Sequence, residues 1–233
     1  MKRNTGAPGR RKDGATTKAQ LLEAAGALFA AKGFDRTTAK EIAERAGTNA
    51  AAVNYYFAGI ENLYGQVLVE AHRRLVSLQA LASVVEADED PRQRFRRVVE
   101  LIVGAVTSPE SSWAVRVLTR EILSPTPHSH ALRQEIGPKI SLVLGLVADL
   151  VGLPREHPAV ARTCFSIMAP CLMLLVADRQ PQLVPEFGAV ASDARALADH
   201  MIGFALGGIA NVANIARREA PRRSSARRND ESV

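Results

Sequence analysis

The sequence predicts an all-α protein, and three observations support this fold class. Of the 233 residues, 47% are hydrophobic but only 5% are aromatic. Segments with the alternation of a half-buried strand are scarce, whereas Ala, Leu, Val, Glu and Arg recur throughout. Apolar residues repeat at three- and four-residue intervals, which places them on one face of a helix. A chain of this length is expected to bury a sizeable core.

The N-terminal part is expected to begin with a flexible basic arm followed by two helices. The arm, residues 1–14, mixes basic residues with glycine and proline. The next helix ends at Gly33, because glycine tolerates the left-handed backbone of a helix C-cap. Thr38 and Glu41 have the spacing of a capping box, which predicts the start of a second helix that breaks at Gly47.

A third helix is predicted to run from a cap at Thr48 or Asn49 to about Phe57. A fourth, long helix opens near Ile60 and continues through Leu78. In the third helix, positions i, i+3 and i+4 form the inward stripe, which consists of Val53, Tyr56 and Phe57. The outward face is left to Ala50, Ala51, Asn54 and Tyr55.

The second and third helices, joined by almost no loop, form a helix-turn-helix. The outward face of the third helix lacks the Lys and Glu of an ordinary solvated surface. Alanine methyls permit close approach to a major groove, Asn54 can pair with a base edge, and the Tyr55 hydroxyl can reach a phosphate. This pattern favours double-stranded DNA as a partner. The alternative is a tight packing corner with an exposed tyrosine.

The charge distribution agrees with an anionic partner. The formal net charge is +6, and the positive excess lies in residues 1–75 and 211–233, on either side of a nearly neutral middle. The arginine pairs near the C-terminus add either nonspecific DNA affinity or a solubilising tail.

The segment TTKAQLLEAAGALFAAKGFDRTTAKEIAERAGTNAAAVNYYFAGIENLYGQVL resembles the N-terminal domain of TetR-family transcriptional regulators. The resemblance extends over about 50 residues. It combines the GF pair, TT before the second helix, IA..AG, V.YYF and E.LY. The NAAAVNYYF form, with SPT and HS further on, is most similar to the CecR (YbiH-like) subgroup.

This resemblance implies a homodimeric repressor with an all-helical C-terminal domain that binds small molecules. It also implies DNA contacts from Thr38, Thr48, Asn49, Ala50, Ala51, Asn54 and Tyr55. Most relatives have Lys where this chain has Ile60, which puts one phosphate contact in doubt. Arg10, Arg11 and Lys12 can compensate if the arm follows the minor groove or the phosphates; the alternative is a solvated tail.

The rest of the chain predicts further helices over about 130–151, 158–178 and 190–217. The domains are therefore expected to be the arm 1–14, the helix-turn-helix domain 15–60, a helical effector-binding and dimerisation domain 61–217, and a disordered basic tail 218–233. Small residues at Gly203, Gly207 and Gly208 suit close helix–helix approach in a dimer.

Candidate effector-binding residues come from two helices of this domain. Trp113, Arg116 and Arg120 share a face and suit an anionic or aromatic molecule; the alternative is a core tryptophan beside exposed arginines. Met168 and Met173 lie on a long apolar helix, where they line either a pocket or the dimer interface.

Other kinds of site find little support. His128, His130 and His157 lack further ligands at metal spacing, so surface histidines are favoured over a metal site. Cys164 and Cys171 are seven residues apart on one helix, too far for a disulfide, and are expected to be buried. Catalytic and nucleotide-binding motifs are missing, so neither an enzyme nor a cofactor is expected.

The N-terminus lacks the apolar stretch of a signal peptide, and no apolar run reaches the roughly 18 uncharged residues that span a bilayer. A cytoplasmic protein without a membrane partner is therefore expected. The predicted function is a repressor released from a palindromic operator by a small-molecule effector. The main alternative is a DNA-binding architectural protein without ligand control.

Overall fold

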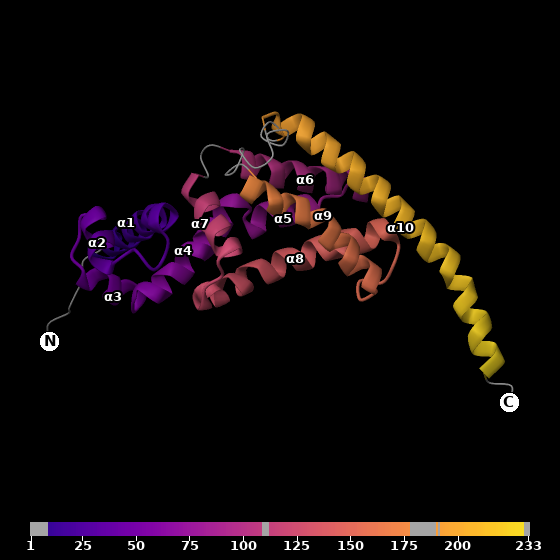
Figure 1. The fold of residues 1–233 in the computed structure, drawn as a ribbon, viewed down its shortest axis with the longest axis horizontal. Helices are drawn as coiled ribbons and strands as arrows, with labels where there is room; N and C mark the ends of the chain where they lie inside the picture. The colour runs from indigo at the N-terminus through magenta and orange to yellow at the C-terminus, as the bar shows by residue number, and fades with distance from the viewer. Residues whose placement is uncertain (1–8, 109–111, 178–189, 191, 231–233) are drawn as a thin grey trace, which may run out of the picture. The chain divides into compact units, whose positions relative to one another are not determined.

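The computed structural model describes residues 9–108, 112–177, 190 and 192–230, and all regular secondary structure in these ranges is helical (Figure 1). The helices are α1 (Gly9–Lys32), α2 (Ala39–Arg45), α3 (Ala51–Phe57), α4 (Ile60–Leu75), α5 (Leu78–Val85), α6 (Pro91–Thr107), α7 (Ser112–Leu123), the 3₁₀ turn η2 (Pro127–Ser129), α8 (His130–Val151), α9 (Pro158–Ala177) and α10 (Ala194–Asp230). The predicted all-α fold class is confirmed.

The chain forms two compact units. The first comprises Met1–Leu75 and Glu110–Glu135, and the second comprises Val76–Pro109 and Ile136–Val233. The first unit therefore contains α4 and α7 in addition to the helices of the predicted DNA-binding domain.

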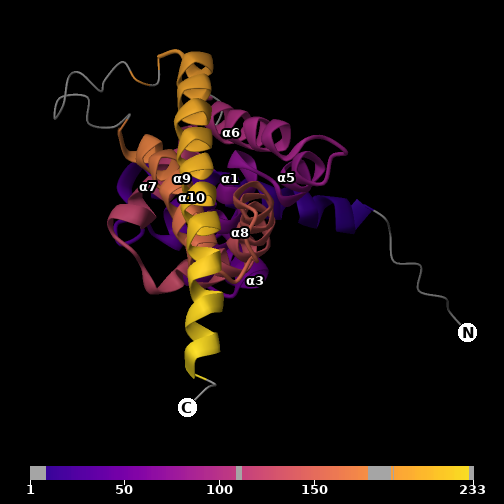
Figure 2. The ribbon, with the colours of Figure 1, turned by 90° about the vertical axis from the view of Figure 1, so that its right-hand side faces the viewer.

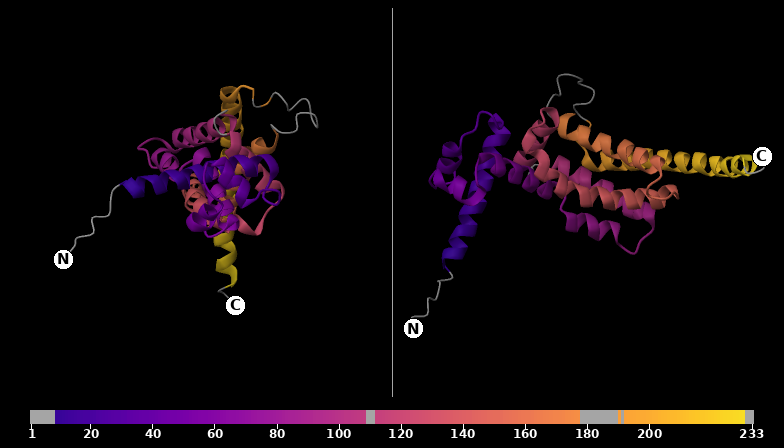
Figure 3. Two further views of the ribbon diagram at one scale, coloured as in Figure 1. Left: turned by 90° about the vertical axis from the view of Figure 1, so that its left-hand side faces the viewer. Right: turned by 90° about the horizontal axis from the view of Figure 1, so that it is seen from below.

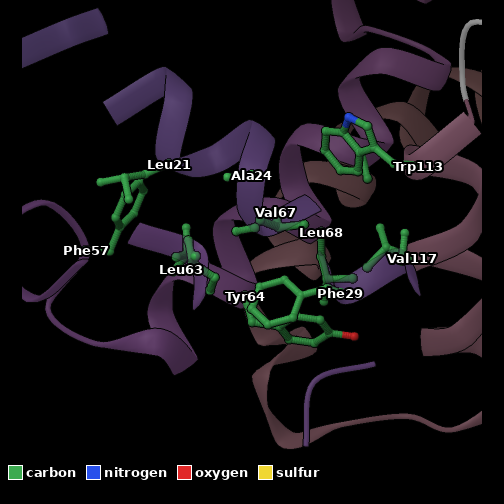
Figure 4. Packing of buried hydrophobic residues seen from close by; sticks show 14 of the residues in the cluster. Leu21, Ala24, Phe29, Phe57, Leu63, Tyr64, Val67, Leu68, Trp113 and Val117 are labelled. Carbon is green, nitrogen blue, oxygen red and sulfur yellow. The ribbon is translucent and has the colours of Figure 1, made fainter. Parts of the chain in front are cut away.

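The core of the first unit forms where α1, α4 and α7 meet. Phe29 of α1 and Tyr64 of α4 contact edge to face, with ring centroids 4.9 Å apart, and Trp113 of α7 is also buried (Figure 4). The α3 side chains Val53 and Phe57 complete the same cluster. Because α4 fills this core, packing places the end of the first segment at Leu75. The predicted functional boundary between residues 60 and 61 stays a prediction.

The second unit is built around α6, α8, α9 and α10. Its fully buried side chains include Phe95, Val103, Leu146 and Ile202, which come from three of these helices. Helix α10 packs against both α6 and α9, and its C-terminal part continues past the other helices of this unit (Figures 2 and 3).

The fourth predicted helix is shorter than expected. The Ser77 hydroxyl accepts a 3.1 Å hydrogen bond from the Ala80 amide and caps a new helix, so α4 ends at Leu75 and α5 begins at Leu78. The prediction of one continuous helix through Leu78 was wrong, because apolar spacing alone does not reveal this cap.

The two chain ends also contain more helix than expected. Helix α1 begins at Gly9, within the expected arm 1–14, and α10 continues to Asp230, within the expected disordered tail 218–233. Extending an existing helix avoids the cost of nucleation, so the helix continues even through residues of low helix propensity such as Gly14 and Pro221. The predicted helices over 130–151 and 158–178 agree closely with α8 and α9.

Candidate functional site

The turn between α2 and α3 fixes the helix-turn-helix. Gly47 has φ = +68°, which only glycine adopts easily, and its amide donates to the Glu44 carbonyl (3.1 Å). The Thr48 amide donates to the Ala43 carbonyl (2.9 Å). These two bonds form a Schellman motif, which ends α2 sharply and redirects the chain into α3.

The start of α2 has the predicted capping box. The Glu41 amide donates to the Thr38 hydroxyl (3.3 Å), and the Thr38 amide donates to Glu41 Oε2 (3.0 Å). Lys32 and the Thr38 amide hold the pKa of Glu41 below its ordinary value. Because the Thr38 hydroxyl also donates to Glu41, a phosphate contact from Thr38 requires that bond to be exchanged.

The Asn49 side chain bonds to the first turn of α3. Its Oδ1 accepts a 3.1 Å hydrogen bond from the Ala52 amide, which also donates to the Asn49 backbone carbonyl (3.0 Å). Of the two predicted cap candidates, Asn49 makes this bond, although the residue directly before α3 is Ala50. The bond uses the side-chain oxygen and leaves the side-chain amide nitrogen, a donor, for another partner.

The facing of α3 agrees with the prediction. Val53 and Phe57 are buried, Tyr56 is half-buried, and Tyr55 is 82% exposed. The remaining outward residues, Ala50, Ala51 and Asn54, are also exposed. The Tyr56 hydroxyl lies close to Gly14 of α1, 3.5 Å from where a Cβ on that glycine would lie. Tyr56 therefore serves packing, and Tyr55 belongs to the free face.

The other predicted DNA contacts belong to the turn before α3 and to the start of α1. Thr48 is half-buried in the turn before α3. Arg10, Arg11 and Lys12 lie in the first turns of α1, and their side chains fall outside the described part of the structure. Ile60 opens α4 and packs against the core of the first unit. The roles of all these residues in DNA binding remain predictions.

Two of the three predicted effector residues of α7, Trp113 and Arg120, make packing contacts with α1 and α4. Trp113 is buried, and its indole nitrogen donates a 2.8 Å hydrogen bond to Glu23. The Arg74 guanidinium lies 4.7 Å from the ring centroid of Trp113. Arg120 donates to the carbonyls of Ala30 and Ala31 and thereby satisfies the end of α1. Arg116 is exposed on the same helix.

A cavity of about 590 Å³ lies elsewhere, between α6, α9 and α10 of the second unit. Met168 is half-buried and Met173 is 59% exposed on α9, but neither is among the residues that line the cavity. Sequence reasoning missed the lining residues because they come from three helices separated by long stretches of chain. Pro170, noted for its place inside a helix, does line it.

Two of the histidines and both cysteines take part in packing or in hydrogen bonds at a helix end. The His128 ring packs on Phe34, with centroids 4.7 Å apart, and His157 Nδ1 accepts from the Ala159 amide at the start of α9. Both cysteines are buried and free, as predicted. Within the described ranges, no three His, Cys, Asp or Glu residues gather as metal ligands would.

Comparison with known families gives two matches. Residues 21–67 match the family described as "Bacterial regulatory proteins, tetR family". Residues 91–209, about half of the chain, match "HTH-type transcriptional dual regulator CecR, C-terminal domain".

Two curated relatives are similar to parts of the chain. The HTH-type transcriptional dual regulator CecR of Shigella flexneri is 31% identical over 150 residues, which cover 60% of this chain and 66% of the relative. The probable HTH-type transcriptional regulator YttP of Bacillus subtilis (strain 168) is 31% identical over 88 residues, 37% and 42% of the two chains. Both alignments span less than two thirds of the relative.

Solved structures share the fold. The fatty acid degradation regulator FadR from Bacillus halodurans has a TM-score of 0.65 at 16% identity, covering 82% of this chain and 98% of its own. FadR from Bacillus subtilis, in complex with stearoyl-CoA, has a TM-score of 0.66 at 13% identity, covering 82% and 98%. A TetR-like regulator from Rhodococcus sp. RHA1 has a TM-score of 0.62 at 20% identity, covering 83% and 96%.

Proposed function

The chain belongs to the TetR family of bacterial regulatory proteins, with a CecR-type C-terminal domain, and we propose that it is a repressor released from a palindromic operator by a small-molecule effector. The exposed face of α3 is the observation that carries the DNA-binding part of this proposal. Buried Val53 and Phe57 anchor the helix, while Asn54 and the 82% exposed Tyr55 are presented on a surface of small residues. Such a surface can enter a major groove.

The homodimer of this proposal uses the apolar faces of α9 and α10. Large apolar side chains are exposed there, namely Phe165 (74%), Leu172, Met173 and Ile215. Gly203 and Gly207 of α10 leave open space where a Cβ would lie, so a second helix can approach closely. A second copy of the chain that covers this face would set the spacing of two α3 helices on DNA.

The apolar faces of α9 and α10 also suit contact with a membrane, so a measurement must distinguish membrane contact from dimer formation. The stretches Pro158–Leu175 and Ala194–Arg218 are long and apolar enough to cross a membrane by length and composition. We propose a cytoplasmic dimer, in which these residues meet a second copy. Light scattering in detergent-free buffer should give the mass of a dimer, and Phe165→Glu should yield monomer. Protein that requires detergent and sediments with vesicles would contradict the dimer.

The DNA-binding proposal is tested by selecting sites from randomised duplexes and titrating salt on the selected sequences. A recovered palindrome with tight, sequence-dependent binding is the expected result. Enrichment of no sequence, with affinity that only collapses as salt rises, would favour the architectural protein.

Comparing Tyr55→Phe with Tyr56→Phe tests which face of α3 contacts DNA. We expect Tyr55→Phe to weaken operator binding about fivefold or more, because one hydrogen bond to a charged phosphate is lost, with unchanged stability. Tyr56→Phe should leave operator binding nearly unchanged. The reverse pattern would show that the assigned facing does not describe the DNA complex.

A further inference from the structure

The cavity between α6, α9 and α10 has a mostly apolar lining that includes basic but no acidic residues. Most of its wall is apolar and includes Val99, Ile167 and Ile209, one from each helix. Two basic residues also line it, Arg162 from α9 and His200 from α10, and the lining contains neither Asp nor Glu. An apolar pocket whose charged lining residue is an arginine is suited to an amphipathic anion.

In the part of the chain that the structure describes, neither basic side chain has an acidic partner. Neither the Arg162 guanidinium nor the His200 ring has a hydrogen bond or ion pair there. Asp199, adjacent to His200, is 3.2 Å from Arg96 instead. Ser166 donates to the backbone carbonyl of Arg162 and does not engage its guanidinium. Arg162 and His200 are both exposed, so they lie at the open side of the cavity, where a charged ligand group can enter.

Thr163 supplies an independent observation in the same lining. Its side chain is only 7% exposed, and its hydroxyl has no hydrogen-bond partner among the described residues. A helical threonine ordinarily satisfies its hydroxyl on the carbonyl one turn earlier. A buried hydroxyl without a partner is costly, and a polar ligand group can remove that cost.

We propose that this cavity is the effector site, and that it takes a mostly apolar molecule with one carboxylate. Arg162 and His200 hold the carboxylate, and the apolar body lies against Val99, Ile167 and Ile209. A volume of about 590 Å³ is in the range of small-molecule sites. This assignment rests on the proposed function, because it names the chemical class of the effector. An alkyl chain and an alkylated aromatic ring both provide such a body.

Calorimetry on the full-length protein without DNA tests the assignment with three probes: octanoate, 4-propylbenzoate and 1-octanol. Each of the two carboxylates should bind with a stoichiometry of one molecule per chain. The tighter binder shows whether the site prefers an alkyl chain or an alkylated aromatic ring. Octanol, which matches octanoate in length but has no charge, should bind at least about tenfold more weakly, because it loses the charge-assisted hydrogen bonds. Equal binding of octanoate and octanol, or no binding of either carboxylate, would overturn the proposal.

Variants locate the site. Arg162→Gln should weaken octanoate binding about tenfold or more. Arg195→Gln removes an exposed arginine of α10 that does not line the cavity, and should leave binding unchanged. Equal effects of the two variants would mean general charge attraction and would overturn the assignment.

Ala205→Trp distinguishes a ligand site from a protein contact, because Ala205 lines the cavity and a large ring there fills it. We expect loss of octanoate binding with the dimer retained. Loss of the dimer with octanoate binding retained would assign the groove to the second copy of the chain and overturn the proposal.

Operator release separates this inference from the proposed function. If the carboxylate binds through Arg162 but does not release operator DNA, the site stands and ligand control by it fails. If another compound releases DNA equally well from wild type and Arg162→Gln, while neither carboxylate binds, the regulator stands and this site is wrong.

Discussion

The Tyr64 hydroxyl donates a 2.8 Å hydrogen bond to Oε2 of Glu121, and both side chains are almost fully buried. The amide of Thr126 donates to the other carboxylate oxygen (2.8 Å). The carboxylate therefore ties α4 to the segment after α7. Burial, reinforced by the Glu121 carboxylate, raises the pKa of Tyr64, so the phenol remains a donor at neutral pH.

Tyr64→Phe tests the importance of this bond. The variant keeps the ring in the core but leaves a buried carboxylate without one donor, so we expect the free energy of unfolding to fall by about 1–3 kcal/mol. Urea unfolding of the variant and of Tyr55→Phe, whose ring is exposed, gives the comparison. Because the folded pKa of Tyr64 lies above its ordinary 10.0, the contribution is complete below pH 10 and declines above it. Equal stabilities of the two variants would contradict this role.

Close approach of α1 to α7 gives a second prediction. A Cβ on Gly26 would lie 2.7 Å from the Trp113 ring, whereas a Cβ on Gly104 of α6 would meet nothing within 4 Å. Gly26→Ala should therefore lower the unfolding free energy by about 1–3 kcal/mol. Gly104→Ala should leave it unchanged or raise it by up to about 1 kcal/mol. The fluorescence of Trp113, the only tryptophan, reports whether its surroundings change.

The thiols provide a pH-dependent prediction. Burial raises the pKa of Cys171 to about 11 and also raises the pKa of Cys164. At pH 8 about one Cys171 thiol in a thousand is then ionised, and a disulfide reagent should react about a hundredfold more slowly with native than with urea-unfolded protein. The native rate should rise with pH up to about 11. Rapid reaction at pH 8 in native buffer would show that the thiols are accessible.

Local features of the first unit could be predicted from the sequence because they depend on neighbouring residues. The Thr38–Glu41 capping box and the inward stripe of α3 follow from spacing alone. The role of Trp113 could not, because its burial depends on Glu23 and Arg74, which are distant in sequence. The cavity of the second unit was missed for the same reason.

Asn49 makes an observed hydrogen bond at the start of α3 and has a predicted DNA contact, and substitutions can separate the two. Its side-chain oxygen makes the observed bond, and its predicted DNA contact uses the opposite end of the side chain or the neighbouring amides. Asn49→Ala should lower the unfolding free energy by about 1 kcal/mol. Asn49→Asp keeps a capping oxygen and should retain stability, but its negative charge should weaken operator binding by repulsion from phosphates. Normal operator affinity in Asn49→Asp would remove Asn49 from the interface.

Ile60→Lys tests the phosphate contact that relatives of this family usually make from the first residue of α4. Ile60 is half-buried against the core of the first unit. The lysine stem can cover the same apolar surface while its ammonium reaches solvent, so stability should fall by less than about 1 kcal/mol. The added contact, one from each subunit of the dimer, should tighten operator binding at low salt and steepen the slope of log K against log salt by about 1.8. Ile60→Met, which adds no charge, is the control. An unchanged salt slope in Ile60→Lys would mean that residue 60 does not approach the phosphates. DNA binding would then depend on the face of α3 without a phosphate contact from residue 60.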